Sequence, residues 1–309
     1  MSERAPELRL QGKVAIVTGS SQGLGRAEAM ELARAGARVI VNGTTREPAE
    51  KVVAEIRAAG GDAHAVVASV ATMAGARQIV DGALGHYGRL DILVNNAGIV
   101  RAARIDEMTE EDFDAVIGVH LKGTFNMCRL AAPLLCQQRS GVIINTSSTS
   151  GLGHYGNSAY AAAKEGIIGF TRSIARDLGP FNARCNVLRP AGDSRMVTDD
   201  KIVAVSREAE EKYGFPACAD FWMSKWAGGV ADPVHVGRFV VWLCTDAARN
   251  LNGRTLRVRG GDVGIFAEPA VEHSGFKEGG WDATALDDPA VQSRVFGDAV
   301  NRFAPRTTS

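Results

Sequence analysis

The chain has 309 residues, and its 35 lysines and arginines are balanced by 35 aspartates and glutamates. This balance argues against the strong basic field of a protein that binds nucleic acid or an anionic membrane. The five cysteines are widely spaced without a C-x-x-C pair, which favours reduced thiols over a disulfide framework and argues against zinc. No apolar run has the length of a membrane span and the N-terminus has no signal pattern, so we expect a cytoplasmic protein.

Apolar segments of strand length alternate with amphipathic helical segments along most of the chain. A strand at residues 13–19 is followed by a helix at 25–36, a strand at 37–43 and a helix at 48–61. Further strands are predicted at residues 63–69, 91–98, 141–148, 183–190 and 254–261. This order predicts an α/β fold, a doubly wound parallel sheet with helices on both faces.

Two segments interrupt the alternation. Residues 196–231 form a long connection with Trp222 and Trp226, which is either a helical pair with its own small core or a lid over an apolar substrate; its place in the chain favours the lid. Residues 263–309 are a C-terminal tail with little strand pattern, either a docking arm across a partner subunit or a loosely ordered end. We expect residues 1–262 to form a single domain.

The sequence TGSSQGLG follows the first strand and opens the first helix. In this setting Gly19, Gly23 and Gly25 let the backbone turn and approach a pyrophosphate at the helix N-terminus. The simpler alternative is a tight strand-to-helix turn. The sequence NNAG places Asn95 and Ala97 at the carboxyl edge of the sheet, where ligands of such folds bind, although asparagine and glycine are also ordinary turn residues.

The stretch SAYAAAKEG places a tyrosine and a lysine four residues apart in a helical context. Tyr160 and Lys164 therefore share one helix face, and a nearby ammonium is expected to lower the pKa of the phenol and ready it for proton transfer. By itself, such a pair usually lies exposed on a helix surface without a functional role. It gains weight because Ser147 and Ser148 end a strand shortly before it, at the same sheet edge.

Taken together, T-G-x-x-x-G-x-G, N-N-A-G, a serine on the fifth strand and Y-x-x-x-K resemble the short-chain dehydrogenase/reductase family over about residues 10–261. The resemblance implies a Rossmann-like fold and an NAD(P)-dependent oxidoreductase that interconverts a secondary alcohol and a ketone. It implies that Tyr160 is the general acid/base, that Lys164 also holds the nicotinamide ribose, and that Ser148 positions the substrate oxygen, with Ser147 as the fallback. The stretches LDILVNNAG and VHLKGTF and the tail are similar to hydroxyacyl-CoA and hydroxysteroid dehydrogenases related to peroxisomal multifunctional enzymes.

The resemblance also implies a set of cofactor-binding residues: Gly19, Ser21, Gly23, Leu24, Gly25, Gly43, Thr44, Asn95, Ala97, Gly98, Tyr160, Lys164, Pro190 and Ser194. Gly43 stands where a carboxylate would exclude a 2′-phosphate, and Arg46 lies nearby, which favours NADP. Gln22 replaces a basic residue common in NADP enzymes, so NAD stays open. His120 replaces the family's usual asparagine, as part of a proton relay or as a structural substitute. No metal site is expected.

The aromatic segment between Tyr213 and Trp226 favours an apolar substrate, either steroid- or terpenoid-like or a 3-hydroxyacyl or 3-oxoacyl thioester. The family implies a homo-oligomer, a dimer or a homotetramer. The alternative function is a non-catalytic dinucleotide sensor or scaffold, which is disfavoured because Ser148, Tyr160 and Lys164 are all present. An enoyl reductase or epimerase is a second alternative, and the four-residue spacing of tyrosine and lysine disfavours the reductase.

Overall fold

The computed structural model describes residues 9–192, 199–214, 216–218 and 231–297, and it contains an eight-stranded sheet in the order β3-β2-β1-β4-β5-β6-β7-β8. All neighbouring strands are parallel except β7 and β8. The reversal of strand order beside β1 confirms the doubly wound topology. The strands are β1 Val14–Val17, β2 Arg38–Gly43, β3 Asp62–Val67, β4 Ile92–Asn95, β5 Gly141–Thr146, β6 Ala183–Ala191, β7 Thr255–Arg259 and β8 Asp262–Ile265.

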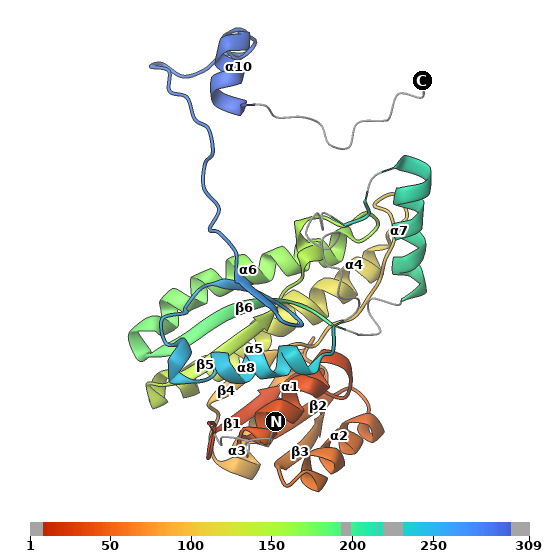
Figure 1. The fold of residues 1–309 in the computed structure, drawn as a ribbon, viewed down its shortest axis with the longest axis vertical. Helices are drawn as coiled ribbons and strands as arrows, with labels where there is room; N and C mark the ends of the chain where they lie inside the picture. Colours follow the sequence, from red (N-terminus) through yellow and green to blue (C-terminus); the bar gives the residue numbers. More distant parts are fainter. Residues whose placement is uncertain (1–8, 193–198, 215, 219–230, 298–309) are drawn as a thin grey trace.

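Helices cover both faces of this sheet (Figure 1). They are α1 Gly23–Arg34, α2 Arg46–Ala58, α3 Met73–Tyr87, α4 Glu110–Ile117, α5 Gly123–Gln138, α6 Ser158–Leu178, α7 Asp200–Tyr213, α8 Val234–Leu243, α9 Ala283–Leu286 and α10 Pro289–Phe296. Within the described ranges, no helix is both long and apolar enough to cross a membrane.

The sheet divides most of the buried core into two large apolar clusters, and a third, small cluster lies between α4 and α6. Alternate residues of each strand point to opposite faces, so Ala15 and Val17 pack with α1, α2 and α8, whereas Val14 and Ile16 pack with α3, α5 and α6. Both faces of the central strands are therefore buried, which explains why they appear in the sequence as unbroken apolar runs.

The strand β8 lies within the segment that the sequence assigned mostly to a tail. It turns back after Gly260 and pairs antiparallel with β7, Val258 opposite Val263. The alternation of Val263 and Ile265 with a glycine is short and leaves both side chains half exposed, so no apolar run marks the strand. Beyond β8, the chain leaves the body past α6 and carries α9 and α10 outward (Figure 1).

A π-helical turn, Gly118–Lys122, joins α4 to α5 without a break in the helical path. Such wide turns insert one extra residue into a helix and occur often at functional sites. The turn contains His120, whose side chain is buried against the sheet edge.

Candidate active site

The glycine-rich loop between β1 and α1 forms one wall of a cleft at the carboxyl edge of the sheet. Gly19 has a positive φ of 63°, and a Cβ there would lie 2.7 Å from the Cα of Ala97. Only glycine tolerates both that conformation and that approach. The N-cap residue Gln22 makes no side-chain cap hydrogen bond, so no side chain of the cap competes for the first amides of α1.

The loop is held by side chains that sequence reasoning did not single out. Thr18 accepts hydrogen bonds through Oγ1 from the backbone N–H groups of Asn96 (3.0 Å) and Ala97 (3.1 Å). The side-chain amide of Asn96 in turn donates hydrogen bonds to the backbone carbonyls of Thr18 and Gly19. Thr18 and Asn96 belong to the two motifs named above, so the sequence indicated where they lie. Their mutual hydrogen bonds could not be predicted, because they depend on the pairing of β1 with β4.

Asn42 connects the same loop to the next two strands. Its Oδ1 accepts from the amide of Gly19 at 3.2 Å, and its Nδ2 donates to the carbonyls of Val66 and Ala68, each at 3.0 Å. The side chain is buried at the end of β2. A buried asparagine before a glycine resembles an ordinary turn in the sequence, which is why its role was missed.

The cleft has a volume of about 340 Å³, and no acidic or basic side chain lines it. Its lining is Gly19, Ser21, Gln22, Gly23, Leu24, Asn42, Gly43, Thr44, Ala68, Ser69, Val70, Asn96, Ala97, Gly98, Ile99 and Val119. Eight of these are predicted cofactor-binding residues. A dinucleotide fits this cleft: glycines let the backbone come close to a pyrophosphate, and the N-terminus of α1 offers it free amides.

Tyr160 and Lys164 lie one turn apart in the first two turns of α6, as their spacing predicts. The ammonium of Lys164 lies 5.3 Å from the centre of the Tyr160 ring and donates to the carbonyl of Thr146 at 2.7 Å. The hydroxyl of Ser148 is hydrogen-bonded to that of Tyr160. Ser147 instead donates to the backbone carbonyl of Lys164 at 2.9 Å, so its hydroxyl ties β5 to α6.

The electrostatics of this pair differ from the sequence prediction. Burial raises the pKa of Tyr160 to about 12, the Ser148 hydrogen bond opposes this shift, and the Cys218 thiol adds to it. Burial also lowers the pKa of Lys164 to about 7. The pKa of the phenol is therefore raised where the sequence predicted a lowering, because burial is the largest influence on it and the Ser148 hydrogen bond offsets only part of the shift.

His120 connects the end of the cleft to the tyrosine. Its Nε2 lies 3.0 Å from the N–H and 2.8 Å from the carbonyl of Ile99, and its ring meets that of Tyr160 edge-on at 5.0 Å. Burial and then the charge of Lys164 lower the pKa of His120 well below its usual value, so the ring is neutral. Its buried Nδ1 has no hydrogen-bond partner among the described residues.

The remaining predicted residues lie around this centre in different ways. Asn95 is buried beneath the cleft, where its amide donates to Oδ1 of Asn145 at 2.8 Å, and it does not line the cleft. Gly25 supports the wall from behind, where a Cβ would clash with Asn96. Pro190 lies near the end of β6, opposite Val258. Ser194 falls outside the described residues.

The predicted lid at residues 196–231 is described only in part. It contains α7, whose N-cap Asp199 accepts from the amides of Lys201 and Ile202. The tryptophans that suggested the lid, Trp222 and Trp226, lie outside the described residues.

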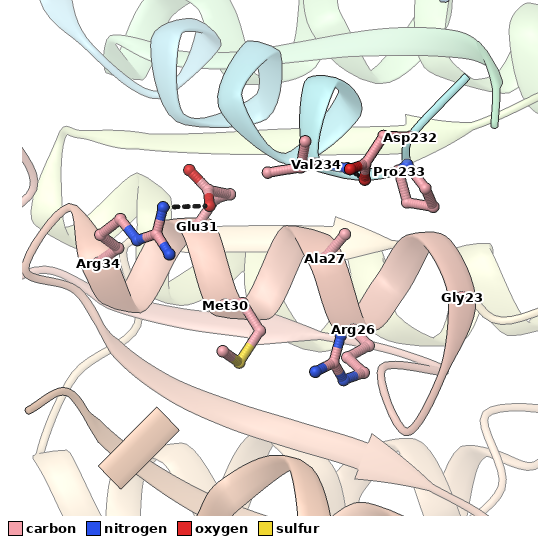
Figure 2. A pocket seen from close by; sticks show the side chains of 9 residues that line it. All are labelled: Gly23, Arg26, Ala27, Met30, Glu31, Arg34, Asp232, Pro233 and Val234. Atoms are coloured by element: carbon pink, nitrogen blue, oxygen red, sulfur yellow. Dashed lines mark hydrogen bonds and ion pairs between the residues drawn. The ribbon is translucent and has the colours of Figure 1, made fainter. Parts of the chain in front are cut away.

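A second hollow, of about 310 Å³, lies between α1 and the start of α8 (Figure 2). Arg34 and Glu31 form an ion pair on its border, with 3.2 Å between Nη1 and Oε1. Gly23 is the only predicted site residue in its lining, whereas eight predicted cofactor-binding residues line the first cleft. Tyr160 and Lys164 line neither hollow. The candidate cofactor site is therefore the first cleft. Over the described ranges, no group of three or more His, Cys, Asp or Glu side chains is arranged to hold a metal ion.

A doubly wound sheet with a glycine-rich loop at its switch point and a Ser–Tyr–Lys group at the same edge defines a nicotinamide-dependent oxidoreductase. Residues 13–202 match the model of the family described as short chain dehydrogenase. The chain belongs to the short-chain dehydrogenase family.

Named relatives agree with this assignment. The chain is 34% identical over 257 residues to 3-oxoacyl-[acyl-carrier-protein] reductase FabG of Thermotoga maritima, covering 83% of this chain and all of that one. It is 39% identical over 295 residues to hydroxyacyl-CoA dehydrogenase ChsB1 of Mycobacterium tuberculosis, covering 90% of this chain and 87% of that one. A crystal structure of a short chain dehydrogenase from Mycobacterium avium superposes with a TM-score of 0.77 at 34% identity, covering 97% of this chain and 100% of that one.

Proposed function

We propose that the protein interconverts a 3-oxoacyl thioester and the corresponding 3-hydroxyacyl thioester with an NAD(P) cofactor. The observation that carries the proposal is the convergence of Ser148, Tyr160 and Lys164 beside His120, which abuts the Gly98–Ile99 end of the dinucleotide cleft. The substrate class is supported by the names of two relatives, a 3-oxoacyl reductase and a hydroxyacyl-CoA dehydrogenase, that each align along most of this chain.

In this proposal, each group has one task. A bound nicotinamide supplies or accepts the hydride at the carbon that bears the oxygen. Ser148 and Tyr160 both bond the substrate oxygen, and the phenol, protonated at neutral pH because its pKa is about 12, gives its proton to that oxygen during reduction. Lys164 binds the ribose and, when charged, stabilises the phenolate that remains.

The proposed role of His120 is to pass the proton onward to replenish Tyr160. Support comes from its edge-on contact with the Tyr160 ring and from the unsatisfied, buried Nδ1, which has room in its bonding for a water molecule. His120→Asn should preserve turnover, whereas His120→Leu should reduce it about tenfold or more without altering cofactor affinity.

Turnover is tested with acetoacetyl-CoA and NADPH, followed by absorbance. The control variant Tyr160→Phe should lower kcat by a factor of about 10² to 10⁴, the usual loss for a general acid, while cofactor binding changes little. If the wild-type protein binds NADPH but turns over neither 3-oxoacyl nor 3-hydroxyacyl thioesters, the substrate proposal fails. If it also turns over no other ketone or alcohol, the sensor alternative replaces it.

We propose NADP as the preferred cofactor. No carboxylate lines the cleft beside Gly43 and Thr44, and the N-terminus of α2 begins at Arg46, where Thr45 makes no side-chain cap hydrogen bond. Arg46 is 77% exposed and pairs with Glu50 only at 3.4 Å, so it is available to a 2′-phosphate.

The variant Gly43→Asp tests this preference. A Cβ at Gly43 would lie 3.1 Å from Oγ and 3.2 Å from Cβ of Ser21, so the glycine-rich loop has to shift slightly, and the variant Gly43→Asn imposes the same shift without the charge. The added carboxylate should weaken NADPH binding about tenfold or more and spare NADH, whereas Gly43→Asn should weaken both similarly. Equal losses in the two variants, measured by fluorescence titration, would contradict a phosphate at this position.

A further inference from the structure

The segment that follows β8, residues 266–297, is here called the C-terminal arm. None of its residues is buried, although the segment is rich in apolar side chains. Val271 is 81% exposed and Phe276 is 87% exposed, and Phe296 is half exposed at the end of α10. Large apolar side chains on one protruding segment mark a surface that is covered by a partner.

The root of the arm is fastened to the body. The amide of Phe266 donates to the carbonyl of Thr255 at 2.9 Å, and the guanidinium of Arg189 lies 4.9 Å from the Phe266 ring centre. Glu268 pairs with Arg172 of α6 at 3.2 Å and with Arg254 at 3.5 Å. These contacts aim the arm past α6 and away from the sheet, as Figure 1 shows.

The tip of the arm has an internal structure of its own. The Trp281 ring lies 5.9 Å from both the Lys277 ammonium and the Arg294 guanidinium, and Gly275 packs against Val295. Asp282 caps α9 and Asp288 caps α10. A unit of this size without one buried residue cannot offset the entropy of its own ordering, so it needs an external surface.

We propose that the C-terminal arm docks on the body of a second copy of this chain. Six acidic and two basic residues give the arm a net charge of −4, and because the whole chain is neutral, the rest of each copy carries +4. The arm of one copy is therefore attracted to the oppositely charged remainder of another copy.

The edge of the sheet supports the same occupant. The outer edge of β8 has no neighbouring strand in the described sheet, and Val263 and Ile265 expose more than half of their side chains just before the arm begins. Two exposed apolar side chains thus lie between the open edge and the root of the arm. In a two-fold dimer, each copy supplies one arm and receives the other, which leaves no arm uncovered.

The test is a cross-linking experiment on the full chain. Ala270→p-benzoylphenylalanine protein is made in light and in ¹⁵N-labelled form, the two are mixed and allowed to exchange subunits, and the mixture is irradiated. Arms that dock on a second copy give light–heavy cross-links in about half of the cross-linked pairs, as random pairing in a dimer requires. Cross-links confined to light–light and heavy–heavy species, or the absence of cross-links, would overturn the proposal.

Sedimentation equilibrium gives an independent measure. The double variant Val271→Ser/Phe276→Ser should raise the dissociation constant of self-association about a hundredfold or more, since two apolar anchors are lost. Ile105→Ser is the matched control, because Ile105 is 78% exposed but lies in the body, and it should leave the constant unchanged. Equal constants for the double variant and the wild type would refute the docking. The outcome does not depend on the substrate proposed above.

Discussion

Replacing Glu28 with glutamine should stabilise the protein at neutral pH. Glu28 lies on α1, facing α8, with no exposed surface and with both carboxylate oxygens unpaired among the described residues. The two helices approach closely there, since a Cβ at Gly237 would lie 2.6 Å from the carbonyl of Ala27. The side chain therefore cannot reach solvent without separating the helices.

The magnitude follows from the pKa. Burial raises the pKa of Glu28 from 4.5 to about 8, so at pH 7 the folded protein holds a proton there that the unfolded chain has released. The free energy of unfolding is then lowered by about 3 kcal/mol at pH 7, and by about 5 kcal/mol above pH 8. Below about pH 4.5 Glu28 is protonated in both states and the free energy of unfolding is not reduced. It falls as the pH rises toward 8, because the folded state keeps a proton that the unfolded state has released.

The assay is urea unfolding of the wild type and Glu28→Gln at several pH values between 5 and 8. The stability gained by the variant should grow by about 1.4 kcal/mol per pH unit across that window. Glu31→Gln is the control, because Glu31 on the same helix is paired with Arg34 and Arg238 and should yield no such gain. A difference between Glu28→Gln and wild type that does not vary with pH would refute the reasoning.

Three further variants probe other parts of the structure. Lys164→Met should abolish turnover yet stabilise the fold most below pH 7. Burial lowers the lysine pKa to about 7 from its unfolded value of 10.5, so the cost of burial is full below pH 7 and declines as the pH rises toward 10.5; a thermal scan showing no gain at pH 6 would contradict this. Asn42→Ala leaves the Gly19 amide and two carbonyls without their partner and should lower the free energy of unfolding by about 3 kcal/mol in urea, while a loss below about 1 kcal/mol would mean that the network is dispensable. His154→Leu removes the bridge from Ser150 (3.1 Å) to Ser206 of α7 (3.4 Å), and if α7 is part of the predicted substrate lid, it should raise KM about tenfold with little change in kcat; steady-state kinetics with the reverse pattern would argue against that lid.

The fold was predictable because its strands are buried on both faces. Each of the seven strands predicted from apolar runs overlaps a strand of the structure, from Val14–Val17 to Thr255–Arg259. The eighth, Asp262–Ile265, was missed because an edge strand with half-exposed valine and isoleucine has no continuous apolar run. Its pairing depends on the turn at Gly260 and on the neighbouring strand β7, and neither is a property of the strand itself.

The candidate site was predictable where a single motif contains the geometry. Tyr160 and Lys164 share a helix face because of local spacing alone. The direction of the Tyr160 pKa could not be predicted, since it depends on how deeply the two side chains are buried. The hydrogen bonds of Asn42 could not be predicted either, because its three partners lie in different segments of the chain.

The π-helical turn at Gly118–Lys122 acts as a one-residue insertion between two helices of ordinary pitch. Deleting one residue there would let α4 and α5 run on as a single α-helix while rotating the preceding segment by about 100° relative to the following one. His120 and Val116 would then leave the faces on which they are now buried. The number of residues in this turn, more than their identity, decides whether the His120 ring contacts the Tyr160 ring. Relatives with one residue fewer in this turn should therefore place a different side chain against the tyrosine.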